Sequence, residues 1–133
     1  MVCMFEVLEH TTKPHIAIKN VYKILKKGDY FLASVPFNFH IHDEPHDYFR
    51  FTEHGLRMLL NKFSTVSIVA RNGWLESILV NFIRLDKEKN LLAKLLGKLF
   101  TVIYFLIYPL TMLTQKIIIS KKLTTGYFIE AKK

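Results

Sequence analysis

The chain has 133 residues, half of them hydrophobic, a formal net charge of +8 and a single cysteine. This length suits one domain with its own core, and one cysteine excludes an internal disulfide or a zinc site built from cysteine pairs. Residues 1–83 carry nine Lys or Arg against eight Asp or Glu, whereas residues 84–133 carry ten against three. Because the basic segment is also the most apolar one, it indicates an anionic membrane surface as partner, and no nucleic-acid partner is expected.

The first predicted elements alternate between strand and helix. Residues 2–8 are a short apolar run, typical of a strand buried on both faces of a parallel sheet. Residues 14–27 repeat apolar side chains at three-and-four spacing and end in a Lys-Lys-Gly turn, which predicts a helix with a left-handed glycine stop. Residues 30–35 form a second predicted buried strand.

The next elements continue this alternation. Residues 37–51 are rich in aromatic side chains and His without a regular period, and so form a loop long enough to carry function. Thr52 is placed to cap a helix over residues 53–62. Residues 65–70 and 127–131 are predicted strands. Strands alternating with helices predict an α/β fold with one sheet.

An apolar insert, residues 75–123, separates the last two strands. It is most apolar from Leu91 to Ser120, and the seventeen residues from Leu99 to Gln115 contain no charge. This length is at the short limit for a membrane span, and Pro109 interrupts it. Lysines lie on both sides of this stretch: Lys94, Lys98, Lys116, Lys121 and Lys122.

The insert has two interpretations. If the last strand rejoins the sheet, a single crossing is excluded, and either two helices in the membrane interface or a shallow re-entrant hairpin bent at Pro109 fits. The alternative is a helical lid that packs on its own domain or on a dimer partner. The first interpretation predicts a cytoplasmic protein, peripheral at the inner face of the membrane.

Three motifs precede the insert: Glu-Val-Leu-Glu-His at residues 6–10, Leu-Lys-Lys-Gly at residues 25–28, and His-Asp-Glu-Pro-His-Asp-Tyr-Phe-Arg-Phe-Thr at residues 42–52. Together they resemble the second half of a class I S-adenosylmethionine-dependent methyltransferase of the type 11 kind. The resemblance implies the C-terminal part of a Rossmann-like seven-stranded fold with a reversed last strand. The family's Gly-x-Gly-x-Gly cofactor loop and its acidic ribose-binding residue have no counterpart, so we expect little cofactor binding and no activity from this chain alone.

The resemblance also implies positions for the cofactor. It places Phe5, Glu6 and Val7 at the carboxyl edge of the sheet, beside the methionine end of S-adenosylmethionine. The acceptor is an O, N or C atom, and the apolar basic insert makes a lipid-linked acceptor plausible. A non-catalytic truncated product or a membrane-surface binding module is the alternative.

The loop supplies candidate catalytic groups. His42 or His46, oriented by Asp47, is a candidate general base, since histidine titrates near neutrality. Tyr48 and Arg50 are candidate substrate-binding residues. The alternative for Asp47 and Arg50 is an ion pair that ties the loop down.

The first motif also suggests a metal site. Glu6, Glu9 and His10 repeat a Glu-x-x-Glu-His arrangement that some RNA 2′-O-methyltransferases and quinone O-methyltransferases use to hold a divalent metal. Two carboxylates and an imidazole suit Mg²⁺ or Mn²⁺, and His40 or His42 could complete the set. The alternative is that Glu9 and His10 tie the following helix.

One partner prediction concerns residues 2–8. In the full fold a strand from the missing N-terminal half would flank this strand. We therefore expect a bare edge here that pairs with that half or with another chain.

Overall fold

The computed structural model describes residues 1–118 and 122–133. It divides into two compact units: residues 1–37, 41–71 and 126–133 form the first, and residues 38–40 and 72–125 form the second. The first unit is a mixed α/β structure with one four-stranded sheet. The second unit contains the predicted insert 75–123 and a few residues on either side of it.

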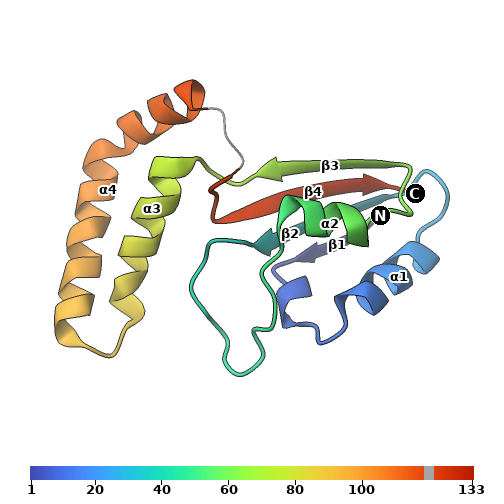
Figure 1. Cartoon of the computed structure of the whole chain (residues 1–133), viewed down its shortest axis with the longest axis horizontal. Coiled ribbons are helices and arrows are strands. Elements are labelled where there is room, and N and C mark those ends of the chain that lie inside the picture. Colours follow the sequence, from blue (N-terminus) through green and yellow to red (C-terminus); the bar gives the residue numbers. More distant parts are fainter. Residues whose placement is uncertain (119–121) are drawn as a thin grey trace. The chain divides into compact units, whose positions relative to one another are not determined.

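The sheet has the order β1-β2-β4-β3 (Figure 1). Its strands are β1 (Val2–Phe5), β2 (Tyr30–Pro36), β3 (Thr65–Ala70) and β4 (Gly126–Lys132). β1 and β2 are parallel, and β4 is antiparallel to both β2 and β3. The last strand therefore lies reversed inside the sheet, while β1 forms an edge within the described residues.

One face of the sheet carries the core. Helices α1 (Pro14–Ile24) and α2 (Glu53–Leu59) cover it. The core residues from the two central strands are alternate ones: Phe31, Ala33, Val35, Tyr127, Ile129 and Ala131.

The opposite face of the sheet is open. Phe5, Val69 and Phe128 are about half exposed there, at 55%, 55% and 49%. They border a hollow of about 310 Å³. The expectation of a strand buried on both faces was therefore wrong for β1, whose residues are exposed or half-buried. The second predicted strand, β2, is mostly buried as expected, and Ser34 is buried on the opposite face.

Three predicted boundaries differ clearly from the structure, and one of them is the helix predicted over 53–62, which ends at Leu59. The first strand ends at Phe5 and not at residue 8, because Glu6 has a positive φ of 51° that turns the chain into the 3₁₀ helix η1 (Leu8–His10). The helix predicted over 14–27 ends at Ile24, although Gly28 does take the left-handed conformation, with φ 88°. The Thr52 cap is confirmed, since its side chain accepts a 3.0 Å hydrogen bond from the Gly55 N–H.

The second unit is a helical hairpin. It consists of α3 (Trp74–Ile83), the 3₁₀ helix η2 (Arg84–Lys87) and α4 (Leu91–Ile117). α4 is a single helix that continues through Pro109, although Figure 1 shows that it changes direction along its length. Tyr104 and Gln115, one before and one after Pro109, both donate to Glu76 of α3. The end of the apolar stretch at Ser120 lies outside the described residues.

Candidate functional site

The candidate site lies where β1 and β2 end. Because the two strands are parallel, their carboxyl ends meet at one edge of the sheet, where open α/β sheets bind ligands. The residues after β1 form η1, and the loop after β2 returns over it. The backbone N–H groups of Tyr48 and Phe49 donate to the Glu9 carbonyl, at 2.9 and 3.3 Å, and so hold the loop against η1.

Glu6 is bound by residues of other strands. Its carboxylate accepts hydrogen bonds from the Ser34 hydroxyl, at 2.6 Å, and from the Arg71 guanidinium. No sequence motif pairs Arg71 with Glu6, but Arg71 directly follows β3, a strand that ends at this same edge of the sheet.

Glu9 has an unusual environment for a carboxylate. Its side chain is fully buried, and neither carboxylate oxygen has a hydrogen-bond partner among the described residues. Burial is the main cause that raises its pKa, since a charged carboxylate without water or donors is unfavourable. Such a group needs a proton or a cation.

Two imidazoles face the Glu9 carboxylate. The Nε2 atoms of His10 and His42 lie 3.8 and 3.9 Å from Oε1 of Glu9, and the two rings meet edge to face with centroids 5.0 Å apart. The Nδ1 atom of His10 is 2.8 Å from the His46 carbonyl, which can only accept, so Nδ1 carries the hydrogen. The Nε2 lone pair of neutral His10 is then available on the Glu9 side.

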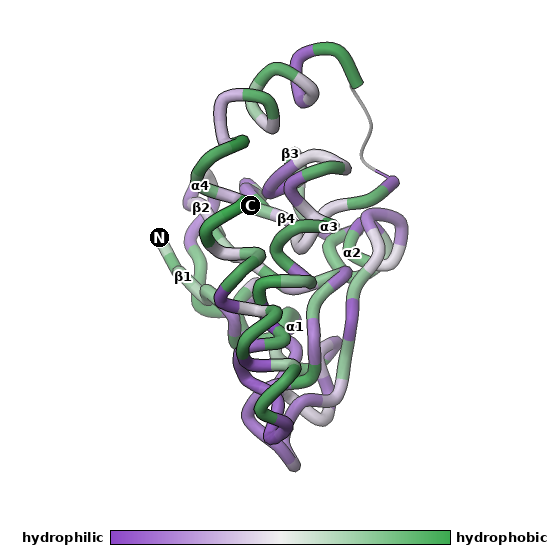
Figure 2. Tube along the Cα trace, turned by 90° about the vertical axis from the view of Figure 1, so that its left-hand side faces the viewer, coloured by the Kyte–Doolittle hydropathy of each residue, from purple (hydrophilic) through white to green (hydrophobic). Residues whose placement is uncertain are grey.

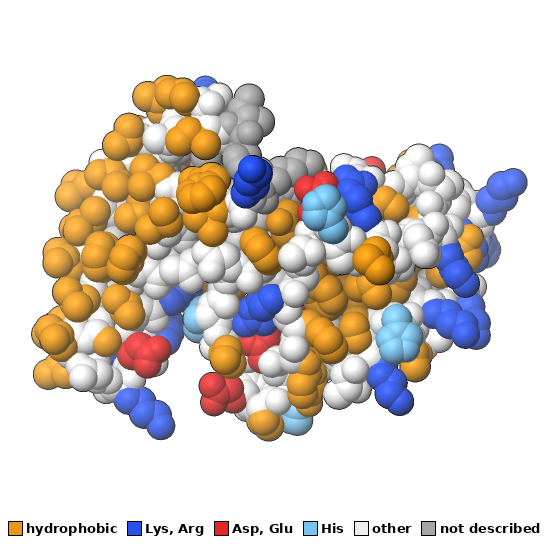
Figure 3. Space-filling view, viewed as in Figure 1, with side chains coloured by type: hydrophobic (Ala, Val, Ile, Leu, Met, Phe, Trp, Pro, Cys, Tyr) orange, Lys and Arg blue, Asp and Glu red, His pale blue; other side chains and the backbone are white. Residues whose placement is uncertain are grey.

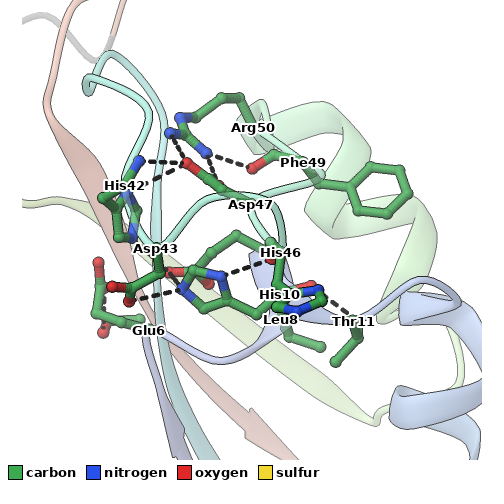
Figure 4. A network of polar contacts seen from close by, with 12 residues as sticks. Glu6, Leu8, His10, Thr11, His42, Asp43, His46, Asp47, Phe49 and Arg50 are labelled. Atoms are coloured by element: carbon green, nitrogen blue, oxygen red, sulfur yellow. Dashed lines mark hydrogen bonds and ion pairs between the residues drawn. The ribbon is translucent and has the colours of Figure 1, made fainter.

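Asp47 and Arg50 hold the loop (Figure 4). Two guanidinium nitrogens of Arg50 donate to the two carboxylate oxygens of Asp47 at 2.6 Å each. The Arg50 hydrogen bonds are the main cause that holds the pKa of Asp47 well below its usual range. The same carboxylate lies 3.3 Å from Nδ1 of His42 and accepts the His42 backbone N–H at 2.9 Å.

The predicted catalytic residues are thus partly brought together. Asp47 does lie beside His42, as an orienting group would. His46 is elsewhere in the loop, with its Nδ1 2.8 Å from the Tyr48 hydroxyl. Tyr48 is exposed, whereas Arg50 is engaged by Asp47.

The residues predicted to bind the cofactor or a metal do not all lie together. The Phe5 and Val7 side chains are exposed. Glu9, His10 and His42 place one ligand atom each within 4.8 Å of one another, and Glu6 is not in this group. Of the two loop histidines considered, His42 completes the set.

The residues of this group fit a metal. In a tetrahedral site with bonds near 2 Å, ligand atoms lie roughly 3.3 Å apart, so small side-chain movements would suffice. The group contains a buried carboxylate that no described residue donates to, and both rings have Nδ1 beside an oxygen acceptor, as metal-binding histidines do. Two imidazoles and one carboxylate favour Zn²⁺, Fe²⁺ or Mn²⁺ over Mg²⁺.

Comparison with known proteins adds no assignment. No protein-family model matches the chain, and no curated protein matches it closely enough to count as a relative.

Proposed function

We propose that this chain corresponds to the C-terminal part of an S-adenosylmethionine-dependent methyltransferase with a seven-stranded Rossmann-like sheet. One observation carries the proposal: the reversed strand β4 lies between β2 and β3, while the two motif segments meet at the carboxyl ends of β1 and β2. A reversed last strand is what the sequence resemblance implied. The cofactor loop would come from sequence outside these 133 residues or from another chain.

In this proposal, the residues after β1 and the residues of the loop have different roles in methyl transfer. The backbone at Phe5, Glu6 and Val7 would line the methionine end of the cofactor. When bound, S-adenosylmethionine would supply the methyl group, and His42 would accept the proton that the acceptor hydroxyl loses. Asp47 orients His42 through Nδ1 and stabilises its protonated form.

Glu9, His10 and His42 could instead form a metal site. Glu9, His10 and His42 would hold the divalent cation, and Asp47 would orient His42 as a ligand. A bound cation supplies Lewis acidity that lowers the pKa of an acceptor hydroxyl. His42 cannot be both ligand and base through Nε2, so in this version His46 is the remaining candidate base.

The experiment supplies a candidate N-terminal half. The DNA upstream of Met1 is translated in all frames, and a segment with a Gly-x-Gly-x-Gly loop is produced together with this chain. We expect the joint preparation to bind S-adenosylmethionine and to transfer tritium from its methyl group to a lipid extract. We expect His42→Asn to lower transfer by roughly 100-fold with cofactor binding retained.

The matched control is His15→Asn, because His15 is an exposed histidine on α1 that touches none of these groups. It should leave transfer unchanged. A joint preparation that binds the cofactor no better than the chain alone would contradict the proposal. It would favour the alternative, a non-catalytic product.

A further inference from the structure

The outer surface of α4 is apolar over most of its length. The helix has 27 residues, its most apolar window has a mean hydropathy of 1.8, and only 6% of that window is buried. By length and composition it is the one described helix able to cross a membrane. Figures 2 and 3 show the hydrophobic residues along it. Its most exposed apolar side chains are Leu91, Leu92, Phe105, Leu106 and Ile117.

Several polar groups of the hairpin lie between its two helices. Glu76 of α3 accepts from the Tyr104 hydroxyl, at 3.1 Å, and from the Gln115 amide. Phe82 and Phe100 stack between the two helices, with ring centroids 4.6 Å apart. The outer face of α4 therefore has few polar groups that would resist transfer out of water, and a helix that is apolar on a solvent side needs a partner.

The charges around α4 indicate which partner. No charge occurs from Leu99 to Gln115, whereas Lys94, Lys98 and Lys116 are exposed on either side. Lysines at both ends of an apolar helix fit anionic headgroups at both ends. A second copy of the same hairpin would bring like charges together.

We propose that α4 lies in the interface of an anionic bilayer, parallel to the membrane plane, with its outer face among the acyl chains. The hairpin geometry argues against a crossing. Gly73 at the start of α3 lies beside Gln115 near the end of α4, so the chain enters and leaves at one end of the hairpin. The other end contains a charged run, Arg84, Asp86, Lys87, Glu88 and Lys89.

A crossing would place that charged run in or across the hydrocarbon. α3 has ten residues, about 15 Å at 1.5 Å per residue, and cannot span a core of about 30 Å. In the membrane plane, the charged run and all three lysines remain at headgroup level. This inference holds whether or not the chain takes part in methyl transfer.

The test is flotation of the full chain with vesicles of phosphatidylcholine alone or mixed with phosphatidylglycerol. We expect binding to the anionic vesicles that weakens at least tenfold when salt is raised from 50 to 500 mM. The double variant Phe105→Glu, Leu106→Glu should lose binding at least tenfold, because these side chains are 72% and 76% exposed. The control is Met58→Glu, at an equally exposed apolar position, 77%, on α2.

Depth measurements separate the two orientations. With Cys3 replaced by Ser, single variants Leu95→Cys, Leu106→Cys and Leu113→Cys carry a fluorophore that brominated lipids quench. Similar shallow quenching at all three positions supports the proposal. Deep quenching at Leu106→Cys alone would mean that α4 crosses the membrane, and would overturn the proposal. The proposal is also overturned if the Phe105→Glu, Leu106→Glu variant binds vesicles as well as wild type, because α4 is then not the contact. A crosslinked dimer without lipid binding would make the partner a second copy and overturn it as well.

Discussion

The Asp47 carboxylate serves two partners, binding Arg50 through both oxygens at 2.6 Å and lying 3.3 Å from Nδ1 of His42. The ion pair fixes the carboxylate, and the carboxylate in turn fixes the ring. The structural and the catalytic interpretations of Asp47 are therefore compatible, since the tie that holds the loop also orients the candidate base.

Asp47→Asn should lower the free energy of unfolding by about 2–3 kcal/mol at pH 7, because it leaves Arg50 without its buried partner. Since the folded-state pKa of Asp47 is lowered, its contribution is complete above the unfolded value of about 3.9 and is lost as pH falls below it. The difference from wild type in urea unfolding should thus shrink below about pH 4. Asp43→Asn is the control, since the Asp43 side chain is 81% exposed. An equal loss in both variants would contradict this account.

Glu9→Gln should separate stability from metal binding. The folded-state pKa of Glu9 is raised, so its contribution is complete below the unfolded value of about 4.3 and is lost as pH rises through the folded value. The variant stays neutral, so we expect the metal-free variant to gain stability relative to wild type between pH 4 and pH 7.5 in urea unfolding.

The same variant should bind Co²⁺ or Zn²⁺ at least tenfold more weakly, as followed by the visible absorption of Co²⁺ and its displacement by Zn²⁺. Asp47→Asn should weaken binding by roughly 10–100-fold, through the orientation of His42. Equal affinity in wild type, Glu9→Gln and the His15→Asn control would mean that any bound metal is held elsewhere.

Gly97→Ala should destabilise the helical hairpin. A Cβ atom at Gly97 would lie 2.3 Å from the backbone nitrogen of Asp86 in η2, so the two elements would have to separate. We expect a loss of about 1–3 kcal/mol in unfolding, together with faster hydrogen exchange in α3 and α4. Leu95→Ala, at an exposed position on the same helix, should cost less than about 0.5 kcal/mol in the absence of lipid.

Cys3→Lys should reduce association through the β1 edge. Val2 and Met4 pack against the core, so lysines at those positions would damage it, whereas Cys3 is exposed. A charge on an edge strand opposes pairing with another strand. Size-exclusion chromatography in detergent should show less self-association for this variant. If the wild-type chain is already monomeric and β1 is protected from hydrogen exchange, another element covers the edge.

Local sequence determined several elements of this protein. Alternating apolar side chains placed β3 at residues 65–70, and the Thr52 hydroxyl set the start of α2, because each depends on neighbours within a few positions. The sequence also predicted that Asp47 and His42 would lie together, since they share one loop. The charge-free stretch of α4 was equally visible in the printed chain.

Contacts between distant segments required the tertiary structure. The turn at Glu6 follows from hydrogen bonds to Ser34 and Arg71, which are 28 and 65 residues away. α4 continues through Pro109, and Glu76 accepts hydrogen bonds from α4 residues on both sides of this proline. His42 meets Glu9 only because β1 and β2 end at the same edge. Sequence periodicity records which face of an element is apolar, but the choice of partner depends on packing between segments that the chain order does not specify.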